Sequence, residues 1–332
     1  MKKKMLLSML IVFSVSIRFF SFDAFAEEQA MVLATWVPAK HYVSVQQTAW
    51  VAEVNAALVG KVKIIEYPGG QLYGPKDMHM AVAKGSVPMG QILQTSLVAT
   101  VPMLKGVYLP FAFENLDQVA QAYSGESLAI IEKAMEKKNI KLVYISFIDG
   151  AHIFSTKKHI ATVSDFKGLR VLTTSPIVSE IFAKLGAAPD PSIPQTEQYL
   201  ALKRGVSDGV AQCSVSGFLQ KTYEAAPYIT QMDMSFPTIL TCMNLNKWNE
   251  LPKEYQEIML NAGKKASATT LATVKGWESK FTEDMIALGA KVIRMAPEER
   301  AKLKETSKFV YEKWAGENGP DAQRLLEINS KL

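Results

Sequence analysis

The chain has 332 residues, of which 48% are hydrophobic and 21% are charged, a balance that supports a packed core and excludes a disordered protein. Its formal net charge of +5 is concentrated at the N-terminus, because residues 27–332 hold 33 basic and 31 acidic side chains. No later basic run indicates nucleic-acid binding, and the length suits one large domain or two lobes.

Residues 1–26 are predicted to be a signal peptide. Lys2–Lys4 provide the positive segment, Met5–Ile17 the apolar segment, and Ala24–Ala26 the small-x-small cleavage site. The apolar run is shorter than the ~20 residues of a membrane span, and no later segment is long and apolar enough to span. We therefore expect export to the periplasm with Glu27 as the first mature residue, an uncleaved membrane anchor being the alternative.

Strand-like and helix-like apolar patterns alternate along the chain, which is typical of an α/β fold. The first expected elements are a strand over Met31–Thr35, a helix with Trp50, Val54 and Leu58 on its apolar face that ends at Gly60, a strand over Val62–Tyr67, and a helix from Pro75 to Gly85.

The second half of the chain continues this alternation. Strands are expected at Leu142–Ile148, His152–Ser155, Leu169–Thr173, Val210–Val215 and Ile239–Asn244. Helices are expected from Ser175-Pro176 to Gly186, from Thr196 to Arg204, from Pro252 to about Leu288, and after Pro297 and Pro320. The helix after Pro252 is longer than ordinary globular helices, and such a length fits a helix that spans two lobes.

Several stretches, in this order and spacing, carry a family resemblance. The main three are Asp165–Val171 (DFKGLRV), Leu185–Pro189 (LGAAP) and Glu197–Gly209 (EQYLALKRGVSDG), supported by Tyr67–Leu72, Leu109–Phe111 and Trp248–Pro252. The set resembles the solute receptors of tripartite ATP-independent periplasmic (TRAP) transporters, in the dicarboxylate-receptor-like branch. The resemblance covers nearly the whole mature chain.

This resemblance implies a two-lobed periplasmic-binding-protein fold of type II-like topology, with crossing hinge strands and a long bridging helix. The first lobe is expected to hold residues 27–149 plus 238–278, and the second 150–237 plus 279–332. The family implies that the lobes close on a small organic molecule and deliver it to the membrane subunits of a TRAP permease. A ligand that contacts both lobes favours the closed form by its differential affinity.

Two positions depart from the family's pattern. The family usually binds a ligand carboxylate with an arginine two places after the residue matching Arg170, and here that place holds Leu172. Another frequent arginine of the family matches His152. Leucine donates no hydrogen bond, so the bidentate carboxylate clamp is absent or rebuilt. We therefore expect a ligand other than a simple dicarboxylate: an aromatic, neutral or amine-bearing compound, or an acid held by other groups.

The same alignment suggests further ligand-binding positions besides His152 and Leu172. They are Trp36, Gln94, Gln195, Tyr199, Gln212, Cys213, Phe236 and Thr238. Trp36 has an aromatic face for stacking, but packing in the core is an equal alternative for Trp36 and the favoured one for Phe236. His152 is nearly as consistent with a structural, hydrogen-bonded histidine.

Chemical motifs give little support for catalysis. The chain lacks a nucleophile elbow, a zinc-binding HExxH and a phosphate-binding loop, and His79 with Asp77 is no metal motif. We expect no enzyme activity, cofactor or metal. The rival hypotheses are a secreted enzyme that uses the cleft, for instance through Cys213 and His152, and a two-lobed receptor that serves a sensor or another transporter. The oxidising compartment allows a Cys213–Cys242 disulfide, which the sequence leaves open.

Overall fold

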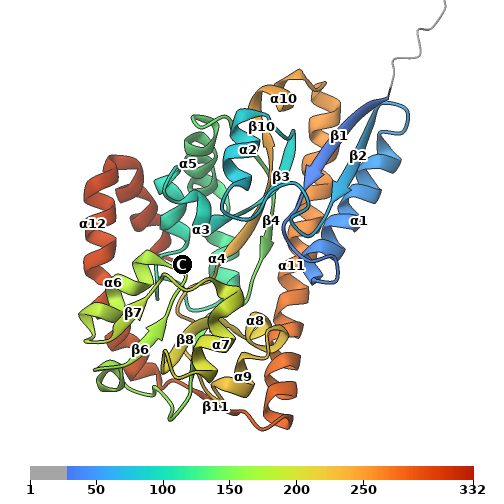
Figure 1. Cartoon of the computed structure of the whole chain (residues 1–332). Helices are drawn as coiled ribbons and strands as arrows, with labels where there is room; N and C mark the ends of the chain where they lie inside the picture. The colour runs from blue at the N-terminus through green and yellow to red at the C-terminus, as the bar shows by residue number, and fades with distance from the viewer. Residues whose placement is uncertain (1–27) are drawn as a thin grey trace, which may run out of the picture.

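The computed structural model describes residues 28–332 and contains two β-sheets covered by helices (Figure 1). The predicted two-lobed α/β fold is confirmed, with one sheet in each lobe. The predicted signal peptide lies outside the described residues.

The first lobe is built on a five-stranded sheet in the order β2-β1-β3-β10-β4. Its strands are β1 (Gln29–Ala34), β2 (Val62–Tyr67), β3 (Met89–Leu93), β4 (Ile140–Phe147) and β10 (Thr238–Asn244). Strand β1 is parallel to β2 and β3, whereas β10 is antiparallel to both β3 and β4. The carboxyl ends of β1, β3 and β4 therefore lie at one edge of the sheet, the usual position of ligand sites in such sheets.

Short helices complete the first lobe. They are α1 (Tyr42–Ala57), α2 (Met78–Lys84), α3 (Gln94–Leu97), the 3-10 helix η1 (Pro102–Val107), α4 (Leu116–Ala122), α5 (Gly125–Glu136) and α10 (Leu245–Glu250). The apolar face of α1 is buried as predicted, and the indole of Trp50 donates to the carbonyl of Met259 at 3.3 Å. The helix expected from Pro75 begins only at Met78, because a backbone-bonded turn from Gly74 precedes it.

The second lobe is built on a six-stranded sheet in the order β11-β9-β5-β8-β6-β7. Its strands are β5 (Ala151–Ser155), β6 (Arg170–Leu172), β7 (Ala188–Asp190), β8 (Gly209–Cys213), β9 (Tyr228–Gln231) and β11 (Lys291–Arg294). Its short helices are η2 (Val163–Phe166), α6 (Pro176–Lys184), η3 (Gln195–Glu197), α7 (Gln198–Lys203), α8 (Ser214–Leu219) and α9 (Thr222–Ala225). Thr196 lies inside η3 and caps no helix, and the strand expected to reach Val215 ends at Cys213.

Two neighbouring segments join the lobes. The chain leaves β4 through Asp149 and Gly150 to enter β5, and it returns from β9 to β10 through residues 232–237. The segments are hydrogen bonded, from Ala151 N to Ser235 O (2.8 Å) and from Met234 N to Ala151 O (2.9 Å). A Cβ at Gly150 would lie 2.6 Å from Asp233 Oδ1 and 3.3 Å from Asp233 Cα, so a larger residue there would displace the Asp233 side chain. The predicted crossing strands are thus present.

The predicted bridging helix is α11 (Lys253–Ala287). Its first half packs on β4 and α1, where Gly263 lies against the carbonyl of Val143. Its far end places Met285 in an apolar cluster of the second lobe. Figure 1 shows α11 running along both lobes. It therefore connects the lobes independently of the two crossing segments.

Helix α12 (Pro297–Asn329) also contacts both lobes. It contains the predicted break, because Gly319 has a non-helical backbone (φ 73°) just before Pro320. Leu303 and Val310 pack in the second lobe, whereas Trp314 and Leu325 pack in the core of the first. The expected boundary, which placed all of 279–332 in the second lobe, therefore differs from this packing. Within residues 28–332, no helix has the length and hydropathy needed to cross a membrane.

Candidate functional site

Buried polar side chains from both lobes gather where the lobes meet. Each of these side chains lies within electrostatic or hydrogen-bonding range of at least one other. We define the interlobe cluster as Tyr42, Tyr108, Asp149, His152, Ser175, Cys213, Ser235 and Glu278. Asp149, Ser175 and Cys213 follow or end strands β4, β6 and β8, which explains how positions distant in sequence converge. Among residues 28–332, no lysine or arginine is buried.

Asp149 lies in the first crossing segment and is fully buried. Its Oδ2 accepts the backbone N–H of Val215 at 3.0 Å, which ties the crossing segment to α8 of the second lobe. Its Oδ1 is buried without a hydrogen-bond partner. The pKa of this carboxyl group is raised to about 7. Burial is the largest cause and the negative charge of Glu278 adds to it, whereas the N–H of Val215 and the ring of His152 act in the opposite direction.

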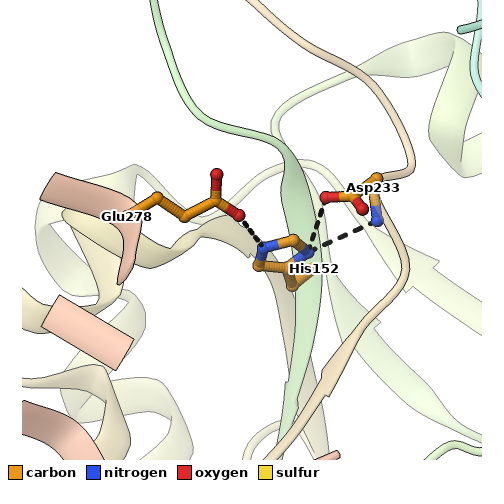
Figure 2. Close-up of side chains that lie close together, drawn as sticks. All are labelled: His152, Asp233 and Glu278. Carbon is orange, nitrogen blue, oxygen red and sulfur yellow. Dashed lines mark hydrogen bonds and ion pairs between the residues drawn. The ribbon is translucent and has the colours of Figure 1, made fainter. Parts of the chain in front are cut away.

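His152 on β5 lies between two carboxylates (Figure 2). Its Nδ1 accepts the backbone N–H groups of Met232 (3.3 Å) and Asp233 (3.4 Å), so the ring hydrogen belongs on Nε2. Nε2 lies 3.5 Å from Glu278 Oε1, and Nδ1 lies 3.9 Å from Asp233 Oδ1. The ring is fully buried. His152 thus connects α11 to the second crossing segment.

The His152, Asp233 and Glu278 side chains are close enough to raise the question of a metal site. The two carboxylates approach opposite edges of the ring, and backbone N–H groups occupy the lone pair of Nδ1 (Figure 2). Only Nε2 is free to coordinate, and it faces Glu278 alone. Nε2 makes no hydrogen bond, and one free ring nitrogen 3.5 Å from one carboxylate does not supply the three ligands that a single ion requires.

Two tyrosines of the first lobe complete the cluster. Burial raises the pKa of Tyr108, whereas the neighbouring hydroxyl groups of Ser175 and Ser235 lower it. The Tyr42 hydroxyl donates to the carbonyl of Phe147 at 2.7 Å, and burial followed by the charge of Asp149 raises its pKa. Sequence reasoning missed both tyrosines, Asp149 and Glu278. The sequence feature that could have indicated them is Asp149, a single carboxylate between an apolar strand and a glycine.

Gln94 and Thr238, two predicted ligand residues, are fully buried and bonded to each other. Gln94 Oε1 accepts from the backbone N–H (3.2 Å) and the hydroxyl (3.0 Å) of Thr238, and Gln94 Nε2 donates to Leu104 O at 2.8 Å. The polar atoms of the Gln94 amide are therefore used within the protein.

Trp36 and Phe236 pack against the core of the first lobe. Phe236 is 4% exposed and lies beside Gly150, at the crossing segments. Trp36 is partly exposed, and its Nε1 is buried without a hydrogen-bond partner. Trp36 therefore retains an unused hydrogen-bond donor near the end of β1.

Gln212 and Cys213 occupy the end of β8, opposite His152 and Ala151 of β5. Gln212 Nε2 donates to Gln220 Oε1 at 2.9 Å, and its Oε1 is buried without a partner. Burial and the charge of Asp149 raise the pKa of the Cys213 thiol well above its usual value. Cys213 and Cys242 are both free, so the open question of a disulfide is resolved against one.

Leu172 is 1% exposed and packs with Phe154, Leu202 and Val210 in an apolar cluster of the second lobe. No arginine of the described chain takes its place. Arg204 is exposed, and the other four arginines bind protein carboxylates in the pairs Arg170–Asp208, Arg294–Asp233, Arg300–Glu114 and Arg324–Glu126.

The remaining two predicted residues lie outside the interlobe cluster. Gln195 is exposed in η3. Tyr199 is partly exposed on α7, and its hydroxyl donates to Glu224 of α9 at 3.3 Å. The structure therefore brings His152 and Cys213 into the cluster and leaves Gln195 and Tyr199 apart from it.

Comparison with known proteins gives matches that agree with this two-lobed geometry. The sequence profile of the bacterial extracellular solute-binding proteins of family 7 matches residues 33–317. A solute-binding protein of Sulfitobacter is 30% identical over 236 residues, which are 70% of each chain. A monocarboxylate 2-oxoacid-binding periplasmic protein of Nostoc is 29% identical over 276 residues, 77% of this chain and 74% of the relative.

Solved structures share the architecture. The crystal structure of a Bordetella pertussis extracytoplasmic solute receptor binding pyroglutamic acid superposes with a TM-score of 0.83 at 25% identity. The match covers 92% of this chain and all of that receptor. The two-lobed arrangement and its interlobe cluster therefore lie in a fold that such receptors share.

Proposed function

Since the chain belongs to family 7 of the bacterial extracellular solute-binding proteins, we propose that it is a periplasmic receptor that binds a small organic molecule between its lobes and delivers it to a TRAP permease. The observation that carries this proposal is the interlobe cluster, in which both lobes contribute buried polar groups to one place. Buried polar atoms without partners cost about 1–3 kcal/mol each, so a ligand that supplies partners to both lobes stabilises their closure.

The ligand is a small molecule held without the guanidinium clamp. The absence of a buried arginine or lysine among residues 28–332 supports this part of the proposal. The similar proteins named above bind a 2-oxoacid and pyroglutamic acid, and both ligands carry one carboxylate. A simple dicarboxylate would need two charge partners that the interlobe cluster lacks.

A thermal-shift screen followed by calorimetry tests this function. The mature protein is screened with organic acids, amines, sugars and aromatic compounds, and at least one is expected to raise the melting temperature through one-to-one binding. The compound should be recovered unchanged by NMR after prolonged incubation. Chemical conversion would instead favour the secreted enzyme. Genes for a small and a large membrane subunit beside this gene would favour a TRAP permease over a sensor as the partner.

Export by a cleaved signal peptide belongs to the same proposal. The basic, apolar and small-residue segments of 1–26 support cleavage after Ala26. The intact mass of the protein from a periplasmic fraction is expected to match a chain that starts at Glu27. A mass that retains residues 1–26, in a membrane fraction, would favour the uncleaved anchor.

A further inference from the structure

Two carboxylates face the interlobe cluster without a cationic side chain to balance them. Asp149 is fully buried with Oδ1 unpartnered, and the side chain of Glu278 is only 20% exposed. The two charges act on each other, since Glu278 raises the pKa of Asp149. The neighbouring ring of His152 accepts backbone N–H groups at Nδ1, and its Nε2, which carries the ring hydrogen, lies 3.5 Å from Glu278 Oε1. The local charge is therefore negative when both carboxylates are ionised.

Aromatic rings lie beside these carboxylates. Tyr42 lies close enough for the charges of Asp149 and Glu278 to raise its pKa. Its hydroxyl is fixed by the carbonyl of Phe147, and its ring meets Trp277 edge to face, with centroids 5.1 Å apart. Trp277 directly precedes Glu278 on α11. Carboxylates combined with tyrosine and tryptophan faces are the chemistry that proteins use to bind ammonium groups.

We infer that the ligand carries a protonated amine, which Asp149 and Glu278 bind beside the rings of Tyr42 and Trp277. This inference rests on the proposed function, because it names the ligand class of the same interlobe site. A cation gives the unpartnered Oδ1 of Asp149 a charge-assisted hydrogen bond and compensates the burial of its charge. An anionic group at the same place would instead add a third negative charge.

Two sets of probes test the ligand class. The amine set contains putrescine, 4-aminobutyrate, alanine, proline and tyramine, and the acid set contains succinate, 4-hydroxybutyrate, pyruvate, pyroglutamate and galacturonate. With 1 mM of each probe at pH 8, at least one member of the amine set is expected to raise the melting temperature by several degrees. No member of the acid set is expected to do so. Stabilisation by acids alone would overturn this inference and leave the receptor function intact. Stabilisation by neither set would overturn this inference, whereas the receptor function fails only if no compound of the wider screen raises the melting temperature.

Isosteric variants then test the two carboxylates. Asp149→Asn still accepts the Val215 N–H and Glu278→Gln keeps its size, so each removes charge with little change in shape. Each is expected to weaken the stabilising amine at least tenfold by calorimetry. Glu283→Gln, at an exposed position of the same helix, is the matched control and should bind as the wild type does. Unchanged affinity in Asp149→Asn would overturn the inference.

Proton linkage gives a readout that does not depend on folding of the variants. The ionisable groups facing Asp149 are Glu278 of α11, His152 of β5, Tyr42 of α1 and Cys213 of β8. Because Asp149 must ionise to pair with the amine, affinity should rise up to about tenfold between pH 6 and pH 8. The wild type should release protons on binding, detected as heats that differ between phosphate and Tris at pH 6.5. The absence of proton release in the wild type would argue against Asp149 as the amine's partner.

Discussion

The hydroxyl of Thr238 lies 3.0 Å from Oε1 of Gln94, which joins the first residue of β10 to the residue that follows β3. Both residues are fully buried. The Tyr123 hydroxyl is also hydrogen bonded to Thr238 Oγ1, at 2.9 Å. The relationship gives both positions a structural role at the base of the crossing segments.

Gln94→Met is therefore expected to destabilise the protein by about 1–3 kcal/mol, because it leaves Thr238 N–H and Leu104 O buried without partners. Urea unfolding measures the change. Gln71→Met, at an exposed glutamine of the same lobe, is the control and should stay within about 0.5 kcal/mol of the wild type. Equal stability of the two variants would show that the Gln94 bonds add nothing.

Leu172→Arg places a guanidinium in an apolar cluster that offers it no partner. We expect a loss of stability of several kcal/mol, and Leu172→Ala should cost about 2–5 kcal/mol through the cavity it leaves. Denaturant unfolding of both variants checks this. Leu200→Arg, at a leucine that is 49% exposed on α7, should be tolerated. A stable Leu172→Arg protein that gains affinity for succinate would restore Leu172 to the ligand site.

Asp149 should make stability depend on pH in an unusual direction. Its pKa is about 7 in the folded protein against 3.8 as the ordinary value, so the folded state holds a proton that the unfolded state has lost between about pH 4 and pH 7. The contribution of Asp149 to the free energy of unfolding therefore falls as pH rises through that window, by up to about 1.4 kcal/mol per pH unit. Above pH 7 both states are ionised and the loss is complete.

The variant Asp149→Asn lacks this titration. Urea unfolding at pH 4.5, 5.5, 6.5 and 7.5 should show the variant gaining stability relative to the wild type as pH rises, with little further change above pH 7. Parallel pH profiles of the two proteins would contradict the raised pKa.

The two thiols should be unreactive in the folded protein. Burial raises the pKa of both Cys213 and Cys242 far above the ordinary value, and thiolate is the reactive form. Ellman's reagent at pH 8 is expected to detect no thiol in native protein and two in urea. Dithiothreitol should leave the melting temperature unchanged. No thiol in urea without reductant would reveal a disulfide.

Arg300 of α12 joins three parts of the chain. It donates to the carbonyls of Phe113 (2.7 Å), Met232 (3.0 Å) and Asp233 (3.2 Å) and pairs with Glu114, and its side chain is only 12% exposed. Arg300→Ala leaves these buried acceptors unpaired and should cost about 2–4 kcal/mol by urea unfolding. Arg324→Ala, which breaks exposed ion pairs of the same helix, should cost less than about 1 kcal/mol.

Apolar periodicity and helix-stop glycines predicted much of the fold because they act over a few residues. The face of α1, strand β2, the glycine ends after α1, α2 and α6, and the length of α11 all follow from local patterns. The short strands β7 and β11 were missed because three or four residues give too little alternation to recognise. The start of α2 was misplaced because a proline also suits the turn before a helix.

The chain order of strands, glycine stops and one very long helix determined the α/β class, because these follow from local backbone preferences and the hydrophobic pattern. The two crossing segments were expected from the family resemblance that the sequence carries. Only the tertiary structure decided that Leu172 packs in an apolar cluster, that the second half of α12 returns to the first lobe, and that Tyr42, Asp149 and Glu278 converge. Residues so far apart in sequence meet through packing of whole elements, which no short-range pattern records.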